Sequence, residues 1–196
     1  PPEPGAEVPG PDAPVAAPPA PILDTDADPD LDADWDQGPV SAAARRMLDR
    51  VRDSVVRVRG FYGANRAEAF HGTAFAVGPD GLLLTNYHVI ARAALAPANY
   101  RLEYSTEDGR VGTVAIVAVD VVHDLALVRT ANAAPPTLRW RVESPARGDR
   151  VYAVGFPLNL GLVITEGIGN GRLDNEFNPR VYYAGAMNPG MSGGPA

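Results

Sequence analysis

The chain has 196 residues, of which 24 are acidic and 17 basic, and it contains no cysteine. The length allows one domain with a hydrophobic core or two small packed subdomains. Without cysteine there is no disulfide, thiol nucleophile or thiolate metal site, and the singly scattered arginines give no reason to expect nucleic acid as a partner. No stretch approaches the ~18 apolar residues that a membrane-spanning helix needs.

Residues 1–40 are rich in proline, alanine and acidic residues. Ten of the 24 acidic residues and 11 of the 20 prolines lie here, with no basic residue. Such a composition cannot offset the entropy lost on ordering, so we expect a disordered acidic tail. The rest of the chain keeps 14 acidic and 17 basic residues, a net charge of about +3 by counting.

The aspartates at alternate positions from Asp24 to Asp36 invite comparison with a calcium loop. Pro29 stands where an EF-hand loop needs glycine, and no glutamate occupies the twelfth position. A solvated acidic spacer is the favoured interpretation, and we expect no metal site.

The segment SAAARRMLDRVRD, residues 41–53, predicts the one helix that we expect. Ser41 is suited to the N-cap, and Met47, Leu48 and Val51 would share one helix face.

Alternating and β-branched runs dominate the remainder of the chain, separated by turn signals such as GPDG and EDG. Six candidate strands precede a linker, ANAAPP, and four follow it. The six are 54–60, 69–78, 82–86, 101–105, 109–120 and 125–130, and the four are 137–142, 150–155, 162–171 and 180–186. This order predicts an all-β barrel or sandwich rather than alternating strands and helices.

Three segments contain residues suited to peptide hydrolysis: TNYHVI with His88, HDLALVR with Asp124, and GMSGGP with Ser192. Serine-based hydrolysis needs a nucleophile, a base, a carboxylate that orients the base, and N–H donors for the oxyanion. Each residue alone also fits an ordinary structural role, as a surface histidine, a turn former or a loop serine. Their joint occurrence favours a catalytic triad.

The order of the three residues discriminates between folds. The GMSGG segment matches the GxSxG elbow of α/β-hydrolases, but in that fold the serine precedes its acid and histidine. Here His88 and Asp124 both come before Ser192. The order found in subtilisin, with the aspartate first, also fails, so only the chymotrypsin order is left.

Two other histidines compete with His88 for the role of base. His123 adjoins Asp124, but neighbouring residues of a strand point to opposite faces, so this pair is badly placed to act together. His71 lies in a predicted strand with no acidic signature nearby.

Four segments together resemble trypsin-like serine peptidases of the HtrA/Deg type. They are GTAFAVGPDGLLLTNYHVI (72–90), VVHDLALVRT (121–130), VYAVGFPLNLGLVITEGIGNGRL (151–173) and AMNPGMSGGPA (186–196). The resemblance extends over residues 41–196. It implies an all-β fold with two six-stranded antiparallel β-barrels of chymotrypsin type, preceded by a short N-terminal helix.

The resemblance also implies a domain organisation. Residues 41–133 would form the N-terminal helix and the first barrel, and residues 134–196 an incomplete second barrel after the tail at 1–40. A second barrel of this type needs six strands, and only four are predicted between the linker and Ser192. We therefore expect the second barrel to be truncated at the C-terminus of this sequence.

Site roles follow from the same resemblance. His88 would be the general base, Asp124 would hold its other ring nitrogen, and Ser192 would be the nucleophile. The backbone N–H groups of Gly190 and Ser192 would form the oxyanion hole, and Ala186 would lie at the base of the specificity pocket. With alanine there, we expect cleavage after small or medium apolar residues.

Met191 occupies the position before the nucleophile, where secreted digestive relatives carry the aspartate that receives a new N-terminus. Activation by that route is therefore not expected, and regulation would depend on loop ordering.

The function implied is that of a serine endopeptidase acting on unfolded or damaged polypeptides outside the bacterial cytoplasm, in the periplasm, cell envelope or medium. The chemistry requires no metal or organic cofactor. Homo-oligomer formation is left open, and no nucleic acid is expected as a partner. The alternatives are a catalytically silent or latent trypsin-like binding scaffold and a protease that processes only itself.

Overall fold

The structure is a computed structural model that describes residues 42–131, 135–139, 141–158, 160–173 and 180–196. The chain divides into two units, residues 1–38 and 39–196, and every described residue belongs to the second. The predicted acidic tail, the Ser41 N-cap and the boundary between residues 133 and 134 lie outside the described residues.

The predicted opening helix is present as α2 (Ala42–Val51), followed by a short 3-10 turn, Arg52–Ser54. Ala44 is buried, and Leu48 and Val51 pack against a buried cluster made by Val55, Val154 and Phe156. The apolar face read from the sequence therefore points toward the protein interior, as expected for an amphipathic helix.

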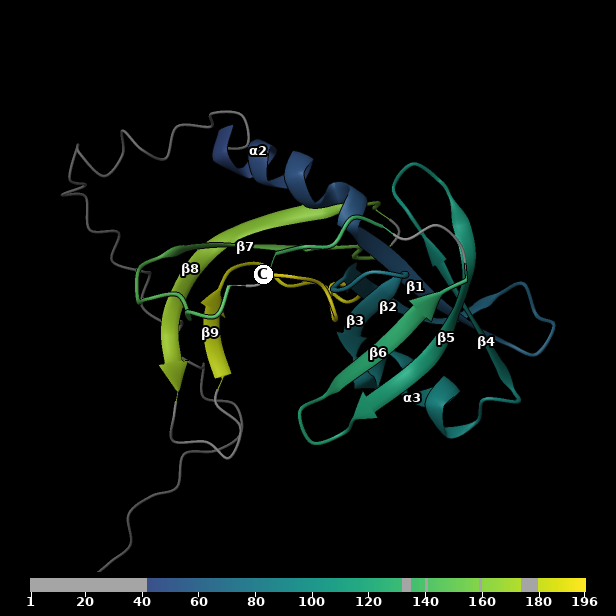
Figure 1. The fold of residues 1–196 in the computed structure, drawn as a ribbon. Coiled ribbons are helices and arrows are strands. Elements are labelled where there is room, and N and C mark those ends of the chain that lie inside the picture. Colours follow the sequence, from purple (N-terminus) through teal and green to yellow (C-terminus); the bar gives the residue numbers. More distant parts are fainter. Residues whose placement is uncertain (1–41, 132–134, 140, 159, 174–179) are drawn as a thin grey trace, which may run out of the picture. The chain divides into compact units, whose positions relative to one another are not determined.

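Six antiparallel strands form a closed barrel in the order β1-β2-β3-β6-β5-β4 (Figure 1). Their bounds are β1 (Val55–Tyr62), β2 (Glu68–Ala76), β3 (Leu82–Asn86), β4 (Tyr100–Ser105), β5 (Val111–Asp120) and β6 (Leu125–Thr130). Each overlaps one of the six strands predicted before the linker. The pairing of β1 with β4 closes the barrel, so β1 has a strand neighbour on both sides.

Alternation along the strands builds the barrel core. In β1, Val56 and Val58 are fully buried, whereas Arg57 lies between them on the opposite face. Leu83 of β3 and Val128 of β6 are also fully buried and belong to the same cluster. The period-2 pattern in the sequence thus specified which side chains fill the barrel.

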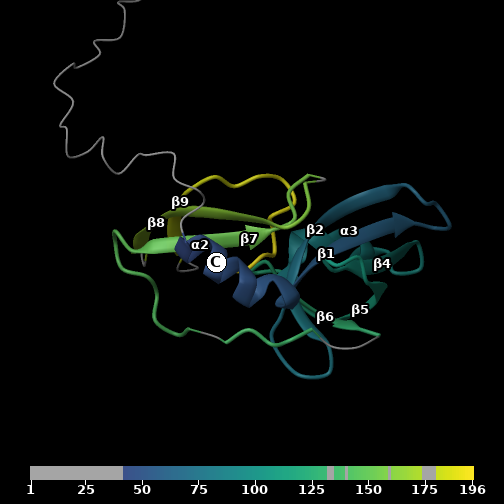
Figure 2. The same ribbon diagram turned by 90° about the horizontal axis from the view of Figure 1, so that it is seen from above.

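A second sheet contains β7 (Arg150–Gly155), β8 (Val163–Leu173) and β9 (Arg180–Ala184) in that order (Figure 2). These strands correspond to the last three predicted ones, and both pairings are antiparallel. The all-β class is confirmed, and the closed six-stranded barrel with a second, partial sheet is consistent with the expected pair of chymotrypsin-type barrels of which the second is truncated.

The strand predicted at 137–142 is wrong for its described residues, and Trp140 lies outside them. Leu138 N donates to Ala76 O at 3.0 Å, and Thr137 Oγ1 donates to Gly78 O at 3.1 Å. These two contacts attach the segment beside the end of β2 without a continuous ladder. Side-chain alternation alone does not produce a strand when no neighbouring edge provides matching hydrogen bonds.

The expectation of a single helix was also wrong, because α3 (Tyr87–Leu95) follows β3 directly. Its buried residues Val89, Ile90 and Ala93 have helical spacing and belong to the barrel core cluster. The helix is short, and its first four residues belong to the TNYHVI motif. The alanine-rich sequence that follows was the available signal.

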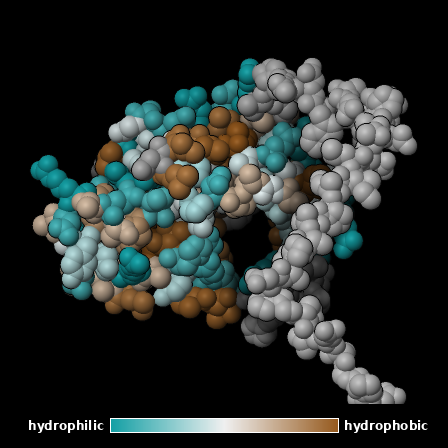
Figure 3. Space-filling model, turned by 180° about the vertical axis from the view of Figure 1, so that it is seen from behind, coloured by the Kyte–Doolittle hydropathy of each residue, from teal (hydrophilic) through white to brown (hydrophobic). Residues whose placement is uncertain are grey.

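No helix in the described part of the chain is both long and apolar enough to cross a membrane. On the face seen in Figure 3, brown apolar areas are interrupted by teal hydrophilic ones.

Candidate active site

His88 lies in the first turn of α3, immediately after β3. Asn86 ends β3 with an extended backbone, φ −76° and ψ 147°, and stands at the N-cap of α3. Asn86 pairs with Leu125 across the β3–β6 ladder, which brings the turn before β6 to the start of the helix. Two hydrogen bonds fasten this junction: Tyr87 N and Asn86 Nδ2 donate to Asp124 O at 3.0 and 2.9 Å.

Asp124 is the last residue before β6 and has a left-handed backbone with φ +56°. Aspartate tolerates this conformation better than most side chains. Its Oδ1 accepts a hydrogen bond from His88 N at 2.8 Å, and its Oδ2 lies 2.7 Å from His88 Nδ1. One carboxylate therefore fixes both the backbone and the ring of the histidine.

The ring contact defines which nitrogen of His88 is available for chemistry. When the imidazole is neutral and donates from Nδ1 to Asp124, Nε2 carries the lone pair. The His88 side chain is 55 % exposed, so this nitrogen is not enclosed by the barrel. The pair has the arrangement of a base with an orienting carboxylate.

Ser192 lies in a loop whose backbone is attached to β2 through Thr73. Thr73 N donates to Ser192 O at 2.8 Å, and Thr73 Oγ1 donates to Gly190 O at 2.7 Å. The same hydroxyl oxygen accepts from Phe156 N at 2.9 Å. Thr73 is fully buried, so these contacts are shielded from water and hold the serine loop on the first barrel.

Close glycine contacts bring the same loop to the start of α3. A Cβ on Gly72 would lie 3.1 Å from Ser192 O and 2.6 Å from Val89 Cγ1, and a Cβ on Gly193 would lie 3.0 Å from Asn86 N. Ser192 therefore lies near the helix that carries His88. Within the described residues Ser192 Oγ makes no hydrogen bond, so the side chains of Ser192 and His88 are not joined.

The two backbone N–H groups predicted for the oxyanion hole have no acceptor among the described residues. Leu158 N donates to Pro189 O at 3.0 Å. Pro189 C=O and Gly190 N–H belong to one peptide group, and in a trans peptide these two bonds point in opposite directions. The Gly190 N–H therefore faces away from Leu158. Gly190 has φ +99°, a conformation that favours glycine.

Ala186 follows β9 and is exposed. Met191, by contrast, is 2 % exposed. A Cβ on Gly155, at the end of β7, would lie 2.9 Å from Met191 Cα, so the loop before the serine packs tightly on the second sheet.

The remaining histidines each pair with a carboxylate other than Asp124. His123 Nδ1 lies 2.7 Å from Asp120 Oδ2, within the turn between β5 and β6. His123 and Asp124 do not pair, as expected, although they lie in a turn rather than in a strand.

The expectation that His71 has no acid nearby was wrong, because its Nδ1 lies 2.6 Å from Glu68 Oε1. Residues three apart in a regular strand face opposite sides. Here the β1–β2 register shifts, with Gly60 opposite Phe70 and Phe61 opposite Glu68. The bulge moves Glu68 to the face of His71, which alternation in the sequence could not reveal.

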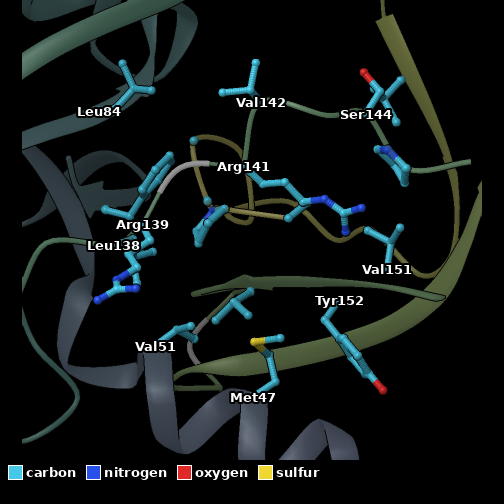
Figure 4. A pocket seen from close by; sticks show the side chains of 18 of the residues that line it. Met47, Val51, Leu84, Leu138, Arg139, Arg141, Val142, Ser144, Val151 and Tyr152 are labelled. Carbon is cyan, nitrogen blue, oxygen red and sulfur yellow. The ribbon is translucent and has the colours of Figure 1, made fainter. Parts of the chain in front are cut away.

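A cavity of about 970 Å³ lies close to the serine loop but does not include the triad residues. Figure 4 shows Met47 and Val51 of α2 on one side of it and Leu84 and Val142 on the other. Residues Gly193 to Ala196 also line it. Its lining combines apolar side chains with charged ones such as Arg141 and Asp149.

The family model of the trypsin-like peptidase domain matches residues 72–196. The chain belongs to the trypsin-like peptidase family. The structure of this trypsin-like peptidase is similar to the crystal structure of the serine endoprotease from Yersinia pestis, with a TM-score of 0.61 and 26 % sequence identity. The superposition covers 80 % of this chain and 53 % of that one. The resemblance to the HtrA/Deg type is confirmed.

Relatives of the peptidase that are similar in sequence are also named as serine proteases. A probable periplasmic serine endoprotease, DegP-like, from Chlamydia trachomatis is 31 % identical over 65 % of this chain and 26 % of its own. Its Rickettsia prowazekii counterpart is 36 % identical over 63 % and 25 %. Serine protease HTRA1 from Xenopus laevis is 29 % identical over 76 % and 34 %. The chain thus spans about a quarter to a third of the length of these relatives.

Proposed function

We propose that this trypsin-like peptidase is a serine endopeptidase that uses His88, Asp124 and Ser192 as its catalytic triad. The observation that carries the proposal is the double contact of the Asp124 carboxylate with His88, at 2.8 Å to the backbone nitrogen and 2.7 Å to Nδ1. This contact leaves Nε2 of His88 as the base, and the Ser192 loop lies near Asn86, the residue just before the helix that carries His88.

The reaction would begin with attack of Ser192 Oγ on the carbonyl carbon of a peptide bond. His88 Nε2 takes the serine proton, and Asp124 stabilises the imidazolium that results. The carbonyl oxygen becomes an oxyanion, which would accept hydrogen bonds from Gly190 N–H and Ser192 N–H. Both N–H groups have no other acceptor in the described part of the chain.

Collapse of the tetrahedral intermediate breaks the carbon–nitrogen bond. His88 Nε2–H donates its proton to the leaving amine, and an acyl ester remains on Ser192. Water then attacks the ester carbonyl while His88 takes one of its protons, and the proton returns to Ser192 Oγ as the acid leaves. All proton transfers use one ring nitrogen, so the Asp124 contact that fixes the ring is used throughout the cycle.

Polypeptides are the proposed substrates, in particular unfolded or damaged ones, and the proposed location is outside the cytoplasm. The relatives named as periplasmic and DegP-like support the location. Ala186, exposed and uncharged, supports cleavage after small or medium apolar residues, because no acid is present there to pair with lysine or arginine.

The test is labelling with a fluorophosphonate probe, using the protein at its full natural length. We expect labelling of the wild type and of Ser144→Ala, a matched change at an exposed serine. Ser192→Ala should not react. A folded wild type that does not react would contradict the proposal and favour a silent or latent binding scaffold. Products that map only to the protein's own chain would instead indicate self-processing.

A further inference from the structure

Another histidine–carboxylate pair lies on β2, next to the loop that carries Ser192. His71 Nδ1 lies 2.6 Å from Glu68 Oε1. Arg57 Nη2 of the neighbouring strand donates to both oxygens of Glu68 at 3.0 and 3.1 Å. The side chains of Arg57, Glu68 and His71 are only 17, 25 and 25 % exposed. Arginine and carboxylate together therefore hold one side of the imidazole ring.

The other side of that ring faces Gly190. A Cβ on Gly190 would lie 2.8 Å from His71 Nε2 and 3.0 Å from His71 Cδ2, closer than packed atoms allow. The edge of the imidazole is thus in contact with the backbone of this glycine. Phe156 O borders the same point, at 2.6 Å from that Cβ position.

Gly190 is consequently held at three places. Pro189 O, in the preceding peptide, accepts from Leu158 N, and Gly190 O accepts from Thr73 Oγ1. The His71 ring lies against the atom between these two peptides. Thr73 and His71 are two residues apart on β2, so they project from the same face of the strand.

We propose that His71, oriented by Glu68 and Arg57, is a positioning residue for the oxyanion hole. It acts through Gly190, whose α-carbon it holds in place, and it does not touch the substrate. The proposal rests on the proposed triad chemistry, since it concerns the same site. Neither the sequence motifs nor the triad geometry requires a histidine or a glutamate at these two positions.

The physical reason is the geometric demand of oxyanion stabilisation. The N–H donor must stand about 2.7–3.1 Å from the developing oxyanion, and a shift of about 1 Å in a reacting group can reduce the rate about 10²-fold. A ring that is free to rotate would let the Gly190 α-carbon drift. The bond to Glu68 prevents this rotation, as the bond to Asp124 does for His88.

The test compares Glu68→Gln, His71→Ala and the double variant in the protein at its full natural length, with peptide hydrolysis and fluorophosphonate labelling as readouts. Glu68→Gln keeps the size of a partly exposed side chain, so it preserves the fold. The matched control is Glu103→Gln. Glu103 pairs with Arg59 and Arg101 on the same barrel, at 3.6 and 2.9 Å, and within the described part of the chain it forms no hydrogen bond or ion pair with the serine loop.

We expect His71→Ala to lower kcat roughly tenfold to a hundredfold with KM within about twofold, because the loss is confined to the transition state. The labelling rate should fall in parallel, while the final extent of labelling, which counts intact sites, stays the same. Glu68→Gln should lower kcat less and should have no further effect once His71 is gone, since Glu68 acts only through His71.

Wild-type kcat in folded His71→Ala would overturn the proposal, as would additive effects of Glu68→Gln and His71→Ala. A loss of kcat in Glu103→Gln equal to that in Glu68→Gln would also overturn it, because the effect would then be a general one of barrel charge. Failure of the wild type itself to label at Ser192 is a different outcome, and it would contradict the proposed triad rather than this inference.

Discussion

Asp124 contacts His88 through both carboxylate oxygens, Oδ1 to the backbone nitrogen at 2.8 Å and Oδ2 to ring Nδ1 at 2.7 Å. The two residues are 36 positions apart in sequence, and the β3–β6 ladder is what brings their segments together. The backbone contact sets the position of the helix start, and the ring contact sets the tautomer. We therefore expect the activity of His88 as a base to depend on the Asp124 carboxylate.

Asp124→Asn should lower kcat by roughly 10⁴, the size of the effect when the aspartate of a Ser-His-Asp triad becomes asparagine, because the amide stabilises the wrong histidine tautomer. Steady-state kinetics with a peptide substrate would measure it. Asp120→Asn is the matched control, because Asp120 pairs with His123 at the same 2.7 Å distance but has no proposed role. The kcat of Asp120→Asn should stay within about tenfold of wild type. Equal losses of kcat in both variants would contradict the assignment of Asp124 as the carboxylate that orients the base.

Gly190→Ala should abolish most activity. The φ of +99° is strained for alanine, and its Cβ would come within 2.6 Å of Phe156 O and 2.8 Å of His71 Nε2. We expect a 10²–10³-fold lower kcat, about the effect of losing one oxyanion donor. Labelling rate and hydrolysis should fall together.

The control for that variant is Gly148→Ala: Gly148 has φ +91°, and apart from its two chain neighbours no atom of the described residues lies within 4 Å of the added Cβ. It shares the backbone strain, about 1–2 kcal/mol, without the collision. We expect a lower melting temperature and unchanged kcat. A catalytic loss in Gly148→Ala similar to that in Gly190→Ala would show that strain alone, rather than the oxyanion loop, explains the effect.

Thr73→Val should weaken both stability and catalysis. The hydroxyl donates to Gly190 O and accepts from Phe156 N, and its loss leaves both groups unpaired in a buried place. We expect about 1–3 kcal/mol of lost stability in denaturant unfolding, together with slower labelling of Ser192. Thr165→Val, a partly buried threonine of β8, is the control and should label at the wild-type rate. Normal labelling in Thr73→Val would mean that the backbone bonds alone hold the loop.

Ala186→Asp should add cleavage after arginine and lysine, because a carboxylate at the proposed base of the specificity pocket would pair with a basic side chain. Cleavage products of an unfolded test protein, mapped by mass spectrometry, would report the change. Ala184→Asp, at another exposed alanine at the end of β9, is the control and should keep the wild-type preference. An identical product pattern in wild type and Ala186→Asp would place the pocket elsewhere.

The ionisation of Asp120 should make the stability of the folded protein depend on pH. Hydrogen bonds from the His123 backbone N–H and then from its side chain hold the pKa of Asp120 below its ordinary value. A carboxyl whose pKa is lowered by folding stabilises the folded state above the unfolded pKa of about 3.9, and this contribution is lost as pH falls through the folded pKa. In His123→Ala the pKa should rise in an NMR titration. An unchanged pKa would show that the backbone contact accounts for the shift.

The residues of the proposed site could be named from the sequence, and the location of the strands could be predicted from it. The motifs around His88, Asp124 and Ser192 are local, and their chain order excludes the other serine hydrolase folds considered. Alternation of apolar residues placed all nine strands that the structure describes, because a half-buried strand must repeat with period 2.

Sequence reasoning failed where the outcome depended on distant partners. The segment at 137–142 alternates like a strand, yet its described residues donate hydrogen bonds at the end of β2 and to Gly78 beyond it, and form no strand ladder. The helix after Asn86 was missed because a short alanine-rich segment becomes stable only when its apolar side packs on the barrel.

By itself, the sequence determined the strand pattern and the identity of the proposed triad, because both are written in residue types at fixed spacings. Only the tertiary structure decided which carboxylates meet the other two histidines, Glu68 for His71 and Asp120 for His123. The pairing of His71 with Glu68 depends on a bulge in the β1–β2 ladder, and its contact with Gly190 joins residues more than a hundred positions apart. Register shifts and contacts across sheets arise from the closing of the barrel and the packing of the second sheet on it, and no local pattern encodes them.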